Sequence, residues 1–377
     1  MSTNRIFDIV ITGGGLAGLS LSILMAREGY RTCLIEKETY PFHKVCGEYI
    51  SMESWDFLIR LGLPLDAWDL PKIHELYITA PNGESLRESL PLGGFGISRY
   101  KLDAALAAIA KKGGVEIFED TKVYDIRFEE GNHKIESSAG LFTAPVACAC
   151  YGKKSNLDVK WKRLFLKEDK NQNYVGVKYH VRTSLPGDQI ALHNFSGGYC
   201  GVSKIEEGKY CLCYLTTSDN LKNNDQSIPA MEERILKQNP ALRKLLEEVE
   251  ILYEDPVTIA QISFAAKSQI ENHALCIGDA AGMITPLCGN GMSMALHGSK
   301  IAAEAITPFL RHQCSRQLME NTYQKNWNRL FAKRLKTGRF IQRFFGKTFW
   351  SVLLIRVMKP FPFLVRALIR QTHGEKF

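Results

Sequence analysis

The segment RIFDIVITGGGLAGLSLSILMAREGYRTCLIEKE restricts the fold of this chain more than any other. Residues 6–12 are largely apolar and predict a buried strand, and residues 17–28 carry apolar side chains at helical spacing. Between them, Gly13, Gly15 and Gly18 form the pattern G-x-G-x-x-G. The first glycine allows a tight turn, the second lets a pyrophosphate approach the backbone, and the third lets the helix pack closely on the strand. The pattern predicts a Rossmann-like α/β unit that binds a dinucleotide at a helix N-terminus.

An acidic residue ends the next strand. Residues 32–35 predict that strand, and Glu36 follows it, eighteen residues after Gly18. In this position the Glu36 carboxylate can accept hydrogen bonds from ribose hydroxyls. The motif alone does not distinguish NAD from FAD.

A second glycine-rich stretch, DAAGMITPLCGNGMSMALHG, follows a short strand predicted at residues 274–277. Gly278 and Asp279 end this strand, and a helix is expected to begin near Gly291. Glycines at such a turn let the backbone approach another group closely. The helix that follows would point its positive end toward a group that becomes anionic. The stretch therefore predicts a second contact with the ligand.

With its preceding glycine, this stretch reads G-D-A-A-x-x-x-x-P-x-x-G-x-G-M. It closely resembles the second flavin-binding motif of FAD-dependent aromatic hydroxylases (the para-hydroxybenzoate hydroxylase-like enzymes) and of geranylgeranyl reductases. The resemblance implies that Asp279 hydrogen-bonds the ribityl chain and that residues 286–291 run along the isoalloxazine. It implies non-covalently bound FAD as the cofactor, and it leaves NADPH or NADH open as the electron donor.

Three further stretches carry the same resemblance, which covers roughly residues 5–315. YPFHKVCGEYIS resembles the P-x-x-K-x-C-G segment of geranylgeranyl reductases, in which a loop crosses near the flavin. GISRYKLDAALAAIA resembles the family's s-R-x-x-L-D-x-x-L helix, with Ser98 as its cap. TKVYDI occupies the place where the family holds the adenine. The cofactor-binding residues predicted from the motifs and the resemblance are Gly13, Gly15, Leu16, Ala17, Gly18, Glu36, Lys37, Lys44, Cys46, Gly47, Arg99, Val123, Gly278, Asp279, Pro286, Gly289, Asn290, Gly291 and Met292.

The chain departs from these families at three places. The G-A-D-G-x-x-S segment stands here as ACYGKKS, with Tyr151 where the family has Asp. Because the hydroxylases' Asp-Gly pair is linked to the handling of NADPH, a hydroxylase-like use of nicotinamide is left open. The reductases' Y-x-W-x-F-P-K substrate motif survives only within GGYCGVSK, where Gly201 replaces Trp, so a prenyl-chain substrate is also left open. The Trp-x-Trp-x-Ile signature of flavin halogenases is absent.

The order of these motifs predicts an α/β fold with a Rossmann-like FAD-binding domain, an inserted antiparallel-sheet substrate domain and a helical C-terminal tail. The segments expected in these three parts are residues 1–75, 98–155 and 255–315 for the FAD-binding domain, 76–97 and 156–254 for the substrate sheet, and 316–377 for the tail. HELYITAPNGESLRESL predicts a hairpin in the substrate sheet that turns at Pro81, Asn82 and Gly83. A charged helix at residues 229–249 is expected to present a solvated face.

Cys46 and Glu48 are the candidate catalytic residues, because both lie in the segment expected near the flavin. Cys46 could donate a proton or contact a substrate double bond, or it could be a small apolar residue at a tight turn. Glu48 is a candidate acid or base if its pocket is dry, although the sequence favours an exposed loop carboxylate.

These features predict an FAD-dependent oxidoreductase that acts on an apolar small metabolite (an isoprenoid, polyketide or aromatic) and resembles geranylgeranyl reductases. Two alternatives remain open. One is a flavin monooxygenase that hydroxylates an aromatic substrate, and the other is a flavoprotein with a non-catalytic, redox-gated binding role.

Other families of function are excluded by simple patterns. None of the ten cysteines forms a C-x-x-C pair, so no metal site or dithiol motif is expected. The N-terminus enters a strand without a signal peptide, and no apolar run is long enough to span a bilayer. The expected location is cytoplasmic.

The positive charge of the chain lies in its tail. Residues 321–377 carry thirteen Lys and Arg and one acid, whereas the whole chain has a net charge of +8. An apolar stripe runs through this segment at steps of three and four residues: Trp327, Leu330, Phe331, Leu335, Ile341, Phe344 and Phe345. Such a stripe predicts either peripheral contact with the inner face of a membrane or packing on the protein itself. Nucleic-acid binding is not expected, because the aromatic residues form a packing face. Pro360 and Pro362 should separate a last short helix at residues 364–370.

Overall fold

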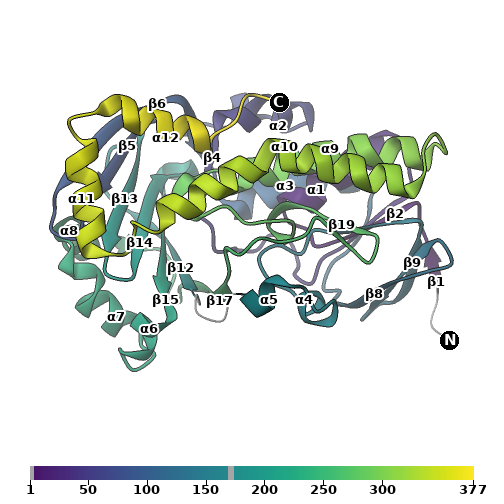
Figure 1. The fold of residues 1–377 in the computed structure, drawn as a ribbon, viewed down its shortest axis with the longest axis horizontal. Coiled ribbons are helices and arrows are strands. Elements are labelled where there is room, and N and C mark those ends of the chain that lie inside the picture. The colour runs from purple at the N-terminus through teal and green to yellow at the C-terminus, as the bar shows by residue number, and fades with distance from the viewer. Residues whose placement is uncertain (1–3, 169–173) are drawn as a thin grey trace.

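The computed structural model describes residues 4–168 and 174–377. One domain is built on a six-stranded sheet with the order β18-β19-β11-β2-β3-β7 (Figure 1). All of its strands run parallel except β18, which is antiparallel to β19. Their bounds are β2 (Ile9–Thr12), β3 (Thr32–Ile35), β7 (Glu116–Phe118), β11 (Val146–Ala149), β18 (Ile270–Glu271) and β19 (Ala274–Cys276). The four central strands are buried along their whole length, as expected for a parallel sheet covered on both faces.

Helices cover one face of this sheet, and a second sheet covers the other. The helices α1 (Leu16–Arg27), α3 (Arg99–Lys112) and α9 (Gly291–Leu310) pack together, with α1 between the other two. The second sheet has the order β1-β10-β9-β8. Its strands and the short helices nearby are β1 (Asn4–Ile6), β8 (Val123–Glu129), β9 (Asn132–Ser137), β10 (Gly140–Ala144), α2 (Trp55–Arg60), α4 (Asn156–Lys160) and α5 (Phe165–Glu168). The single strand predicted at residues 6–12 is therefore two strands, because β1 pairs with β10 and β2 pairs with β11.

The other domain is built on a nine-stranded sheet with the order β16-β12-β15-β14-β13-β5-β6-β4, in which β17 also pairs with β12. Most neighbours are antiparallel, and β13 with β5 is a parallel pair. The strands are β4 (Tyr49–Ser51), β5 (Lys72–Thr79), β6 (Ser85–Gly96), β12 (Tyr174–Arg182), β13 (Gln189–Phe195), β14 (Gly198–Lys204), β15 (Tyr210–Thr217), β16 (Glu250–Ile251) and β17 (Val257–Ile262). The predicted fold class is confirmed, and the predicted hairpin turns between β5 and β6.

Strand pairing moves two of the expected domain boundaries. The sequence places residues 257–262 in the FAD-binding domain, but β17 pairs with β12 of the large sheet. It places residues 156–168 in the substrate sheet, but α4 packs on β8 of the FAD-binding domain. Both segments lie close to an expected boundary between the two domains. There, the domain to which a segment belongs is decided by the strands on which it pairs or packs, and not by its position along the chain.

The helix expected at residues 229–249 is broken into two pieces, α7 (Ile228–Arg234) and α8 (Pro240–Glu248). Asn239 caps α8 by accepting hydrogen bonds from backbone N–H groups, and Pro240 occupies the first turn. The segment is not only a solvated face, because Met231, Leu236 and Leu242 are buried against the large sheet. A short helix, α6 (Ser218–Lys222), precedes it.

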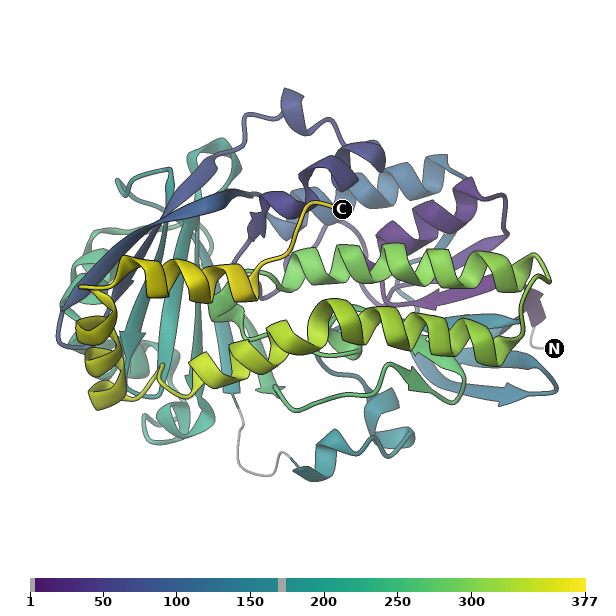
Figure 2. The ribbon, with the colours of Figure 1, turned by 45° about the horizontal axis from the view of Figure 1, so that its top comes forward.

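The C-terminal helices run back across the molecule. Helix α10 (Arg316–Gln342) lies beside α9, and α11 (Thr348–Met358) and α12 (Pro362–Thr372) then cover one face of the large sheet (Figures 1 and 2). The break before Pro362 confirms the predicted final helix. Part of the predicted apolar stripe packs on the protein itself and cannot contact a membrane, since Trp327, Phe331 and Leu335 are buried in the core. Across the described ranges, no helix is both long enough and apolar enough to cross a bilayer.

Candidate active site

The G-x-G-x-x-G turn joins β2 to α1 and leaves no room for side chains at two of its glycines. Gly13 has a φ of +104°, and a Cβ there would lie 2.5 Å from the carbonyl oxygen of Cys150. A Cβ on Gly18 would lie 2.0 Å from the carbonyl oxygen of Gly13. Both distances are shorter than any real contact, so glycine is required for the turn to pack on the neighbouring strand and helix.

Gly15 is different, because the space beside it is bordered only by two cationic side chains. A Cβ on Gly15 would lie 3.4 Å from Arg99 Nη2 and 3.7 Å from Lys44 Nζ. Asp103 binds both cations, with Arg99 held by two hydrogen bonds of 2.7 Å and Lys44 at 3.2 Å. Glu36 Oε2 also lies 4.0 Å from Lys44 Nζ, so the group is neutral as a whole, with its two cations next to the N-terminus of α1. This is suitable chemistry for a pyrophosphate.

The helices α1 and α9 both begin without a side-chain cap. Gly15 has no side chain, the Asn290 side chain accepts no hydrogen bond from its helix, and neither first turn contains an acid. By contrast, Ser98 caps α3 by accepting a hydrogen bond from the N–H of Lys101, as predicted. The first-turn N–H groups of α1 and α9 are therefore left for another acceptor. Both helices pack on Gly278 near their starts, since a Cβ there would lie 3.2 Å from Ala17 Cβ in α1 and 3.5 Å from Ala295 Cβ in α9.

Glu36 lies where the ribose is expected, and its carboxylate is held by backbone N–H groups. Oε2 accepts a hydrogen bond of 2.7 Å from Gly14, and Oε1 accepts one of 2.8 Å from Lys37. The Lys37 side chain points into solvent and pairs with Glu38, so only its backbone lies at the predicted site. The chain just before Val123 also contacts this strand end, because the N–H of Thr121 donates to the carbonyl oxygen of Glu36.

The predicted isoalloxazine loop lies between α9 and the C-terminal helices. Gly289 has a φ of +63°, and a Cβ there would lie 3.0 Å from the Tyr49 ring. Asn290 is fully buried and donates a hydrogen bond of 2.8 Å to the carbonyl oxygen of Thr372. Pro286 is exposed, whereas Met292 is buried in the first turn of α9. Asp279 is partly buried, and its carbonyl oxygen accepts a hydrogen bond of 3.1 Å from Lys267.

The segment Lys-Val-Cys-Gly at residues 44–47 is held by side chains from elsewhere in the chain. Its four successive carbonyl oxygens accept hydrogen bonds, in order, from Lys178 Nζ (3.2 Å), Lys153 Nζ (2.8 Å), Cys211 Sγ (3.2 Å) and Ser203 Oγ (3.1 Å). Three of these donors belong to β12, β15 and β14 of the large sheet. A Cβ on Gly47 would meet no atom within 4 Å, so the loop borders open space. The large sheet therefore fixes the loop that the sequence places near the flavin.

Glu48, next in the chain, is fully buried. The expectation of an exposed loop carboxylate is therefore wrong. Its backbone has a φ of +55°, which is uncommon for a residue with a side chain. Oε1 lies 2.5 Å from Lys178 Nζ and accepts the N–H of Arg99 at 2.8 Å, and Oε2 lies 2.6 Å from His180 Nε2. Burial alone would raise the pKa of Glu48, but Lys178 and His180 outweigh it and lower the pKa to about 2.

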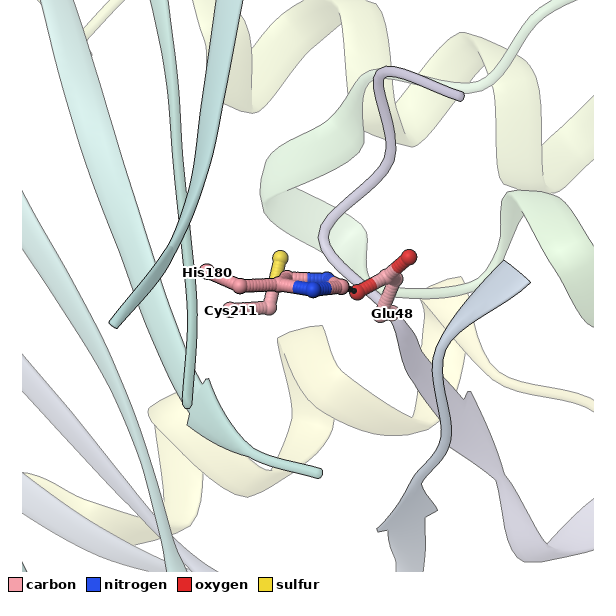
Figure 3. A group of neighbouring side chains, drawn as sticks. All are labelled: Glu48, His180 and Cys211. Atoms are coloured by element: carbon pink, nitrogen blue, oxygen red, sulfur yellow. Dashed lines mark hydrogen bonds and ion pairs between the residues drawn. The ribbon is translucent and has the colours of Figure 1, made fainter. Parts of the chain in front are cut away.

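Glu48, His180 and Cys211 offer three atoms within 4.8 Å of one another, a spacing that a metal ion could use (Figure 3). His180 and Cys211 stand opposite each other on β12 and β15, and both point toward the Glu48 loop. Lys178 already supplies a positive charge to the same carboxylate, and a metal ion beside it would be repelled. The group is better described as a charged clamp.

Tyr151, the residue that departs from the family motif, is part of another buried network. Its hydroxyl donates a hydrogen bond of 2.6 Å to Asp158 and accepts one of 2.7 Å from Arg163. Arg163 also donates to the carbonyl oxygen of Ala280 at 2.9 Å, directly after Asp279. Tyr151 thus helps to fix the second glycine-rich stretch through Arg163.

A cavity that is partly open to solvent begins at the predicted isoalloxazine loop and extends between the large sheet and the C-terminal helices. Leu287, Cys288 and Gly289 line it at the loop, and strands β5, β6 and β13 form one wall. Helices α11 and α12 form the opposite wall. None of the described residues that line it is Asp, Glu, Lys or Arg.

Tyr49 is a candidate that the sequence did not reveal. It lines this cavity next to Gly289, and its buried hydroxyl has no hydrogen-bond partner among the described residues. Burial, with a smaller effect of Glu53, raises the pKa of Tyr49, so the hydroxyl keeps its proton. Cys46 lies three residues earlier and does not line the cavity. Only the nearness of Tyr49 to the K-V-C-G segment could have drawn attention to it.

A Rossmann-type sheet, two helix starts without side-chain caps and two cations at the glycine-rich turn together define a dinucleotide-binding protein. The chain matches the family described as an FAD binding domain over residues 7–336, and it belongs to this family. The predicted cofactor, FAD, is confirmed, as is the prediction of an FAD-dependent oxidoreductase.

Known proteins with a similar sequence or fold have varied roles. The chain is 25% identical over 367 residues to conditioned medium factor receptor 1 of Dictyostelium discoideum, covering 87% of this chain and 68% of that protein. It is 23% identical over 353 residues to digeranylgeranylglycerophospholipid reductase 2 of Methanopyrus kandleri, covering 88% and 84%. The solved structure of a flavin-dependent brominase matches with a TM-score of 0.79 at 19% identity, covering 98% of this chain and 93% of that chain.

Proposed function

We propose that this FAD-dependent oxidoreductase reduces or dehydrogenates an uncharged, apolar compound of the isoprenoid, polyketide or aromatic class, as geranylgeranyl reductases do. The cavity carries this proposal, because it adjoins the predicted isoalloxazine loop and its described lining has no charged side chain. A buried carboxylate or phosphate would find no counter-charge there and would lose its hydration. An acidic aromatic substrate therefore fits this cavity poorly, and an apolar chain or ring fits it well.

Bound FAD would exchange electrons with the substrate. Gly15, Lys44 and Arg99 would hold its pyrophosphate, Glu36 its ribose, Asp279 its ribityl chain, and Gly289 to Gly291 the edge of its ring system. NADPH or NADH is retained as the proposed electron donor.

The protein's own groups would orient the substrate and keep water away. The Tyr49 hydroxyl, protonated and without a partner, would donate a hydrogen bond to a polar group at the inner end of the substrate. Glu48 would act as a positioning residue, since Lys178, His180 and the Arg99 N–H enclose its carboxylate. Cys46 is kept as a candidate catalytic residue in the clamped loop.

Tyr151 favours a reductase over an aromatic hydroxylase. It stands where the hydroxylases have the Asp linked to the handling of NADPH, and its side chain is bound to Asp158 and Arg163. The absent Trp-x-Trp-x-Ile signature likewise favours a reductase over a halogenase, although the fold is shared with a brominase.

An anionic membrane surface would be the source of the substrate. The tail that forms one wall of the cavity carries thirteen cationic residues against one acid in residues 321–377. A peripheral protein with such a surface would collect apolar compounds from an anionic bilayer.

The experiment is anaerobic reoxidation of the reduced holoprotein. The protein is reduced with dithionite, and geranylgeraniol, a polyprenyl quinone or para-hydroxybenzoate is added in detergent. Recovery of the oxidised flavin spectrum with an uncharged compound, but not with para-hydroxybenzoate, is expected. Turnover only with oxygen and an aromatic acid would instead identify a hydroxylase, and halide-dependent turnover would identify a halogenase.

A further inference from the structure

Helix α11 has two apolar faces, although only one is needed for packing, and α12 exposes Phe363 in its first turn. The inner faces, with Ile355, Met358, Val365 and Ile369, line the cavity or pack beside it. On a surface helix of this kind, the opposite face is ordinarily polar. Here it is not.

The outer surface presents large exposed aromatic side chains. Phe349 is 70% exposed, Trp350 45% and Phe363 64%. Leu353 and Val357 continue the face of Phe349 at four-residue steps and are also exposed. The rings of Phe340, Phe344 and Trp350 contact one another in series, at centroid distances of 5.3 and 6.0 Å, and Trp350 also contacts Phe349 at 5.5 Å. We define this surface as the aromatic patch: Phe340, Phe349, Trp350, Leu353, Val357, Phe361 and Phe363.

Cations surround the aromatic patch, and its own chain segment has no acid. Residues 343–374 contain six Lys and Arg and no Asp or Glu. Arg356 pairs with Glu84 and Arg366 with Glu88, both on the hairpin below. The other four cations are exposed and make no ion pair with any acid in the described ranges: Arg343, Lys347, Lys359 and Arg370.

We propose that α11 and α12 form a membrane-docking lid, which seats the aromatic patch in an anionic bilayer and admits the substrate from it into the cavity beneath. Exposed aromatic residues beside free cations match the interface of an anionic membrane, where rings enter the headgroup region and cations meet lipid phosphates. A second copy of the chain fits less well, because two such patches face to face would bring unpaired cations together.

The lid explains why the cavity lies directly behind the patch. Cavity and surface are separated by a single layer of helix, about 10 Å across. An apolar compound could pass between α11, α12 and the hairpin β5–β6 without crossing bulk water. For the identity of the transported compound this inference rests on the proposed function, but membrane binding can be measured without it.

The test is co-sedimentation of the full-length holoprotein with vesicles of phosphatidylcholine, with and without phosphatidylserine. Binding to the anionic vesicles that weakens with salt is expected. F349S/W350S/F363S and K347E/K359E should each weaken this binding by about tenfold or more. These side chains are exposed, so both variants should keep the flavin spectrum and the thermal-unfolding midpoint of the wild type. V159S/L164S, which removes two similarly exposed apolar side chains in and just after α4, should bind vesicles normally.

Vesicle binding unchanged in both patch variants would overturn the proposal, as would a dimer at working concentration that the patch variants dissociate. The proposed function fails separately. If no apolar compound reoxidises the reduced flavin in detergent while the patch variants lose vesicle binding, the lid stands and the assigned substrate class is wrong. If the patch variants reduce an apolar substrate slowly when it is in vesicles and at the normal rate when it is in detergent, the membrane-docking lid and the proposed function are both supported.

Discussion

Lys178 Nζ lies 2.5 Å from Glu48 Oε1, and both side chains are completely buried. Glu48 ends the loop that the sequence places near the flavin, and Lys178 lies in the middle of β12 in the large sheet. The pair therefore joins the two halves of the proposed active site across 130 residues of sequence. It also neutralises a carboxylate that would be costly to bury alone.

Removing one member of this pair should destabilise the protein strongly. Lys178→Met should lower the free energy of unfolding in urea by about 3–5 kcal/mol, because an uncompensated charge stays buried. The double variant Glu48→Gln/Lys178→Met should lose less than the sum of the single variants. Arg182→Ala, at the end of the same strand as Lys178, is the matched control. Arg182 forms an exposed pair with Glu250 on β16, which should contribute less than about 1 kcal/mol. Similar losses for Lys178→Met and Arg182→Ala would contradict the clamp.

His193 should make the protein less stable as the pH falls below 6.5. Burial lowers the pKa of His193 to about 4, against an ordinary value of 6.5. Between these values the unfolded chain takes up a proton that the folded chain does not, so stability is complete above pH 6.5 and is lost as the pH falls toward 4. From pH 7 to pH 5, His193→Gln should lose about 1–2 kcal/mol less than the wild type in urea unfolding. An identical pH dependence for the two proteins would show that His193 is protonated when folded.

Local patterns predicted the turn and the helix cap at the candidate site. Gly13, Gly15 and Gly18 identify their turn because the two spacings between them must agree with a strand before them and a helix after them. Ser98 caps the helix that it precedes. Asn239 and Pro240 are also typical of a helix start, so the break between α7 and α8 could have been predicted from the sequence. The expectation of a single helix rested on the charge of the segment.

Long-range partners could not be predicted. Lys178 and His180 look like ordinary strand residues, and only the folding of β12 against the Glu48 loop pairs them with a carboxylate. The same holds for the tail, where the stripe of Trp327 and Phe331 is used for packing and the exposed patch lies further along the chain. Which face of a helix is covered depends on the elements that pack on it.

The three glycines of the first motif should respond differently to substitution. Gly15→Val should fold normally but purify without colour, because its side chain meets only the ends of Arg99 and Lys44 and takes the space proposed for the pyrophosphate. Gly18→Val should fail to fold, since its Cβ would collide with the Gly13 backbone. Circular dichroism and flavin absorbance after FAD reconstitution separate the two effects. A yellow Gly15→Val protein would show that the pyrophosphate does not bind at this turn.

Tyr49→Phe should weaken substrate binding while FAD stays bound. The lost hydrogen bond is expected to cost about 0.5–1.5 kcal/mol, or roughly three- to tenfold in KM. Tyr179→Phe removes a hydroxyl that binds Glu232 on the other side of the large sheet and serves as the matched control. Steady-state kinetics should show a raised KM for Tyr49→Phe alone. If instead only kcat falls and the pH profile changes, Tyr49 transfers a proton and does not merely hold the substrate.

Leu86→Trp should shorten the substrate that the enzyme accepts. Leu86 lines the cavity within a cluster that includes Ile355 and Val365, whereas Tyr49 belongs to a different cluster beside the predicted isoalloxazine loop. The larger ring would therefore fill the part of the cavity remote from Tyr49 and leave the flavin end unchanged. A twenty-carbon isoprenoid should lose more affinity than a ten-carbon one, by roughly tenfold, since each excluded methylene forfeits about 0.8 kcal/mol of burial. The measurement is the ratio of kcat/KM for the two chain lengths, with FAD content determined from absorbance. An equal loss for both lengths would mean that the substrate does not extend past Tyr49 into the cavity, and the chain would then bind a compact ring at the loop.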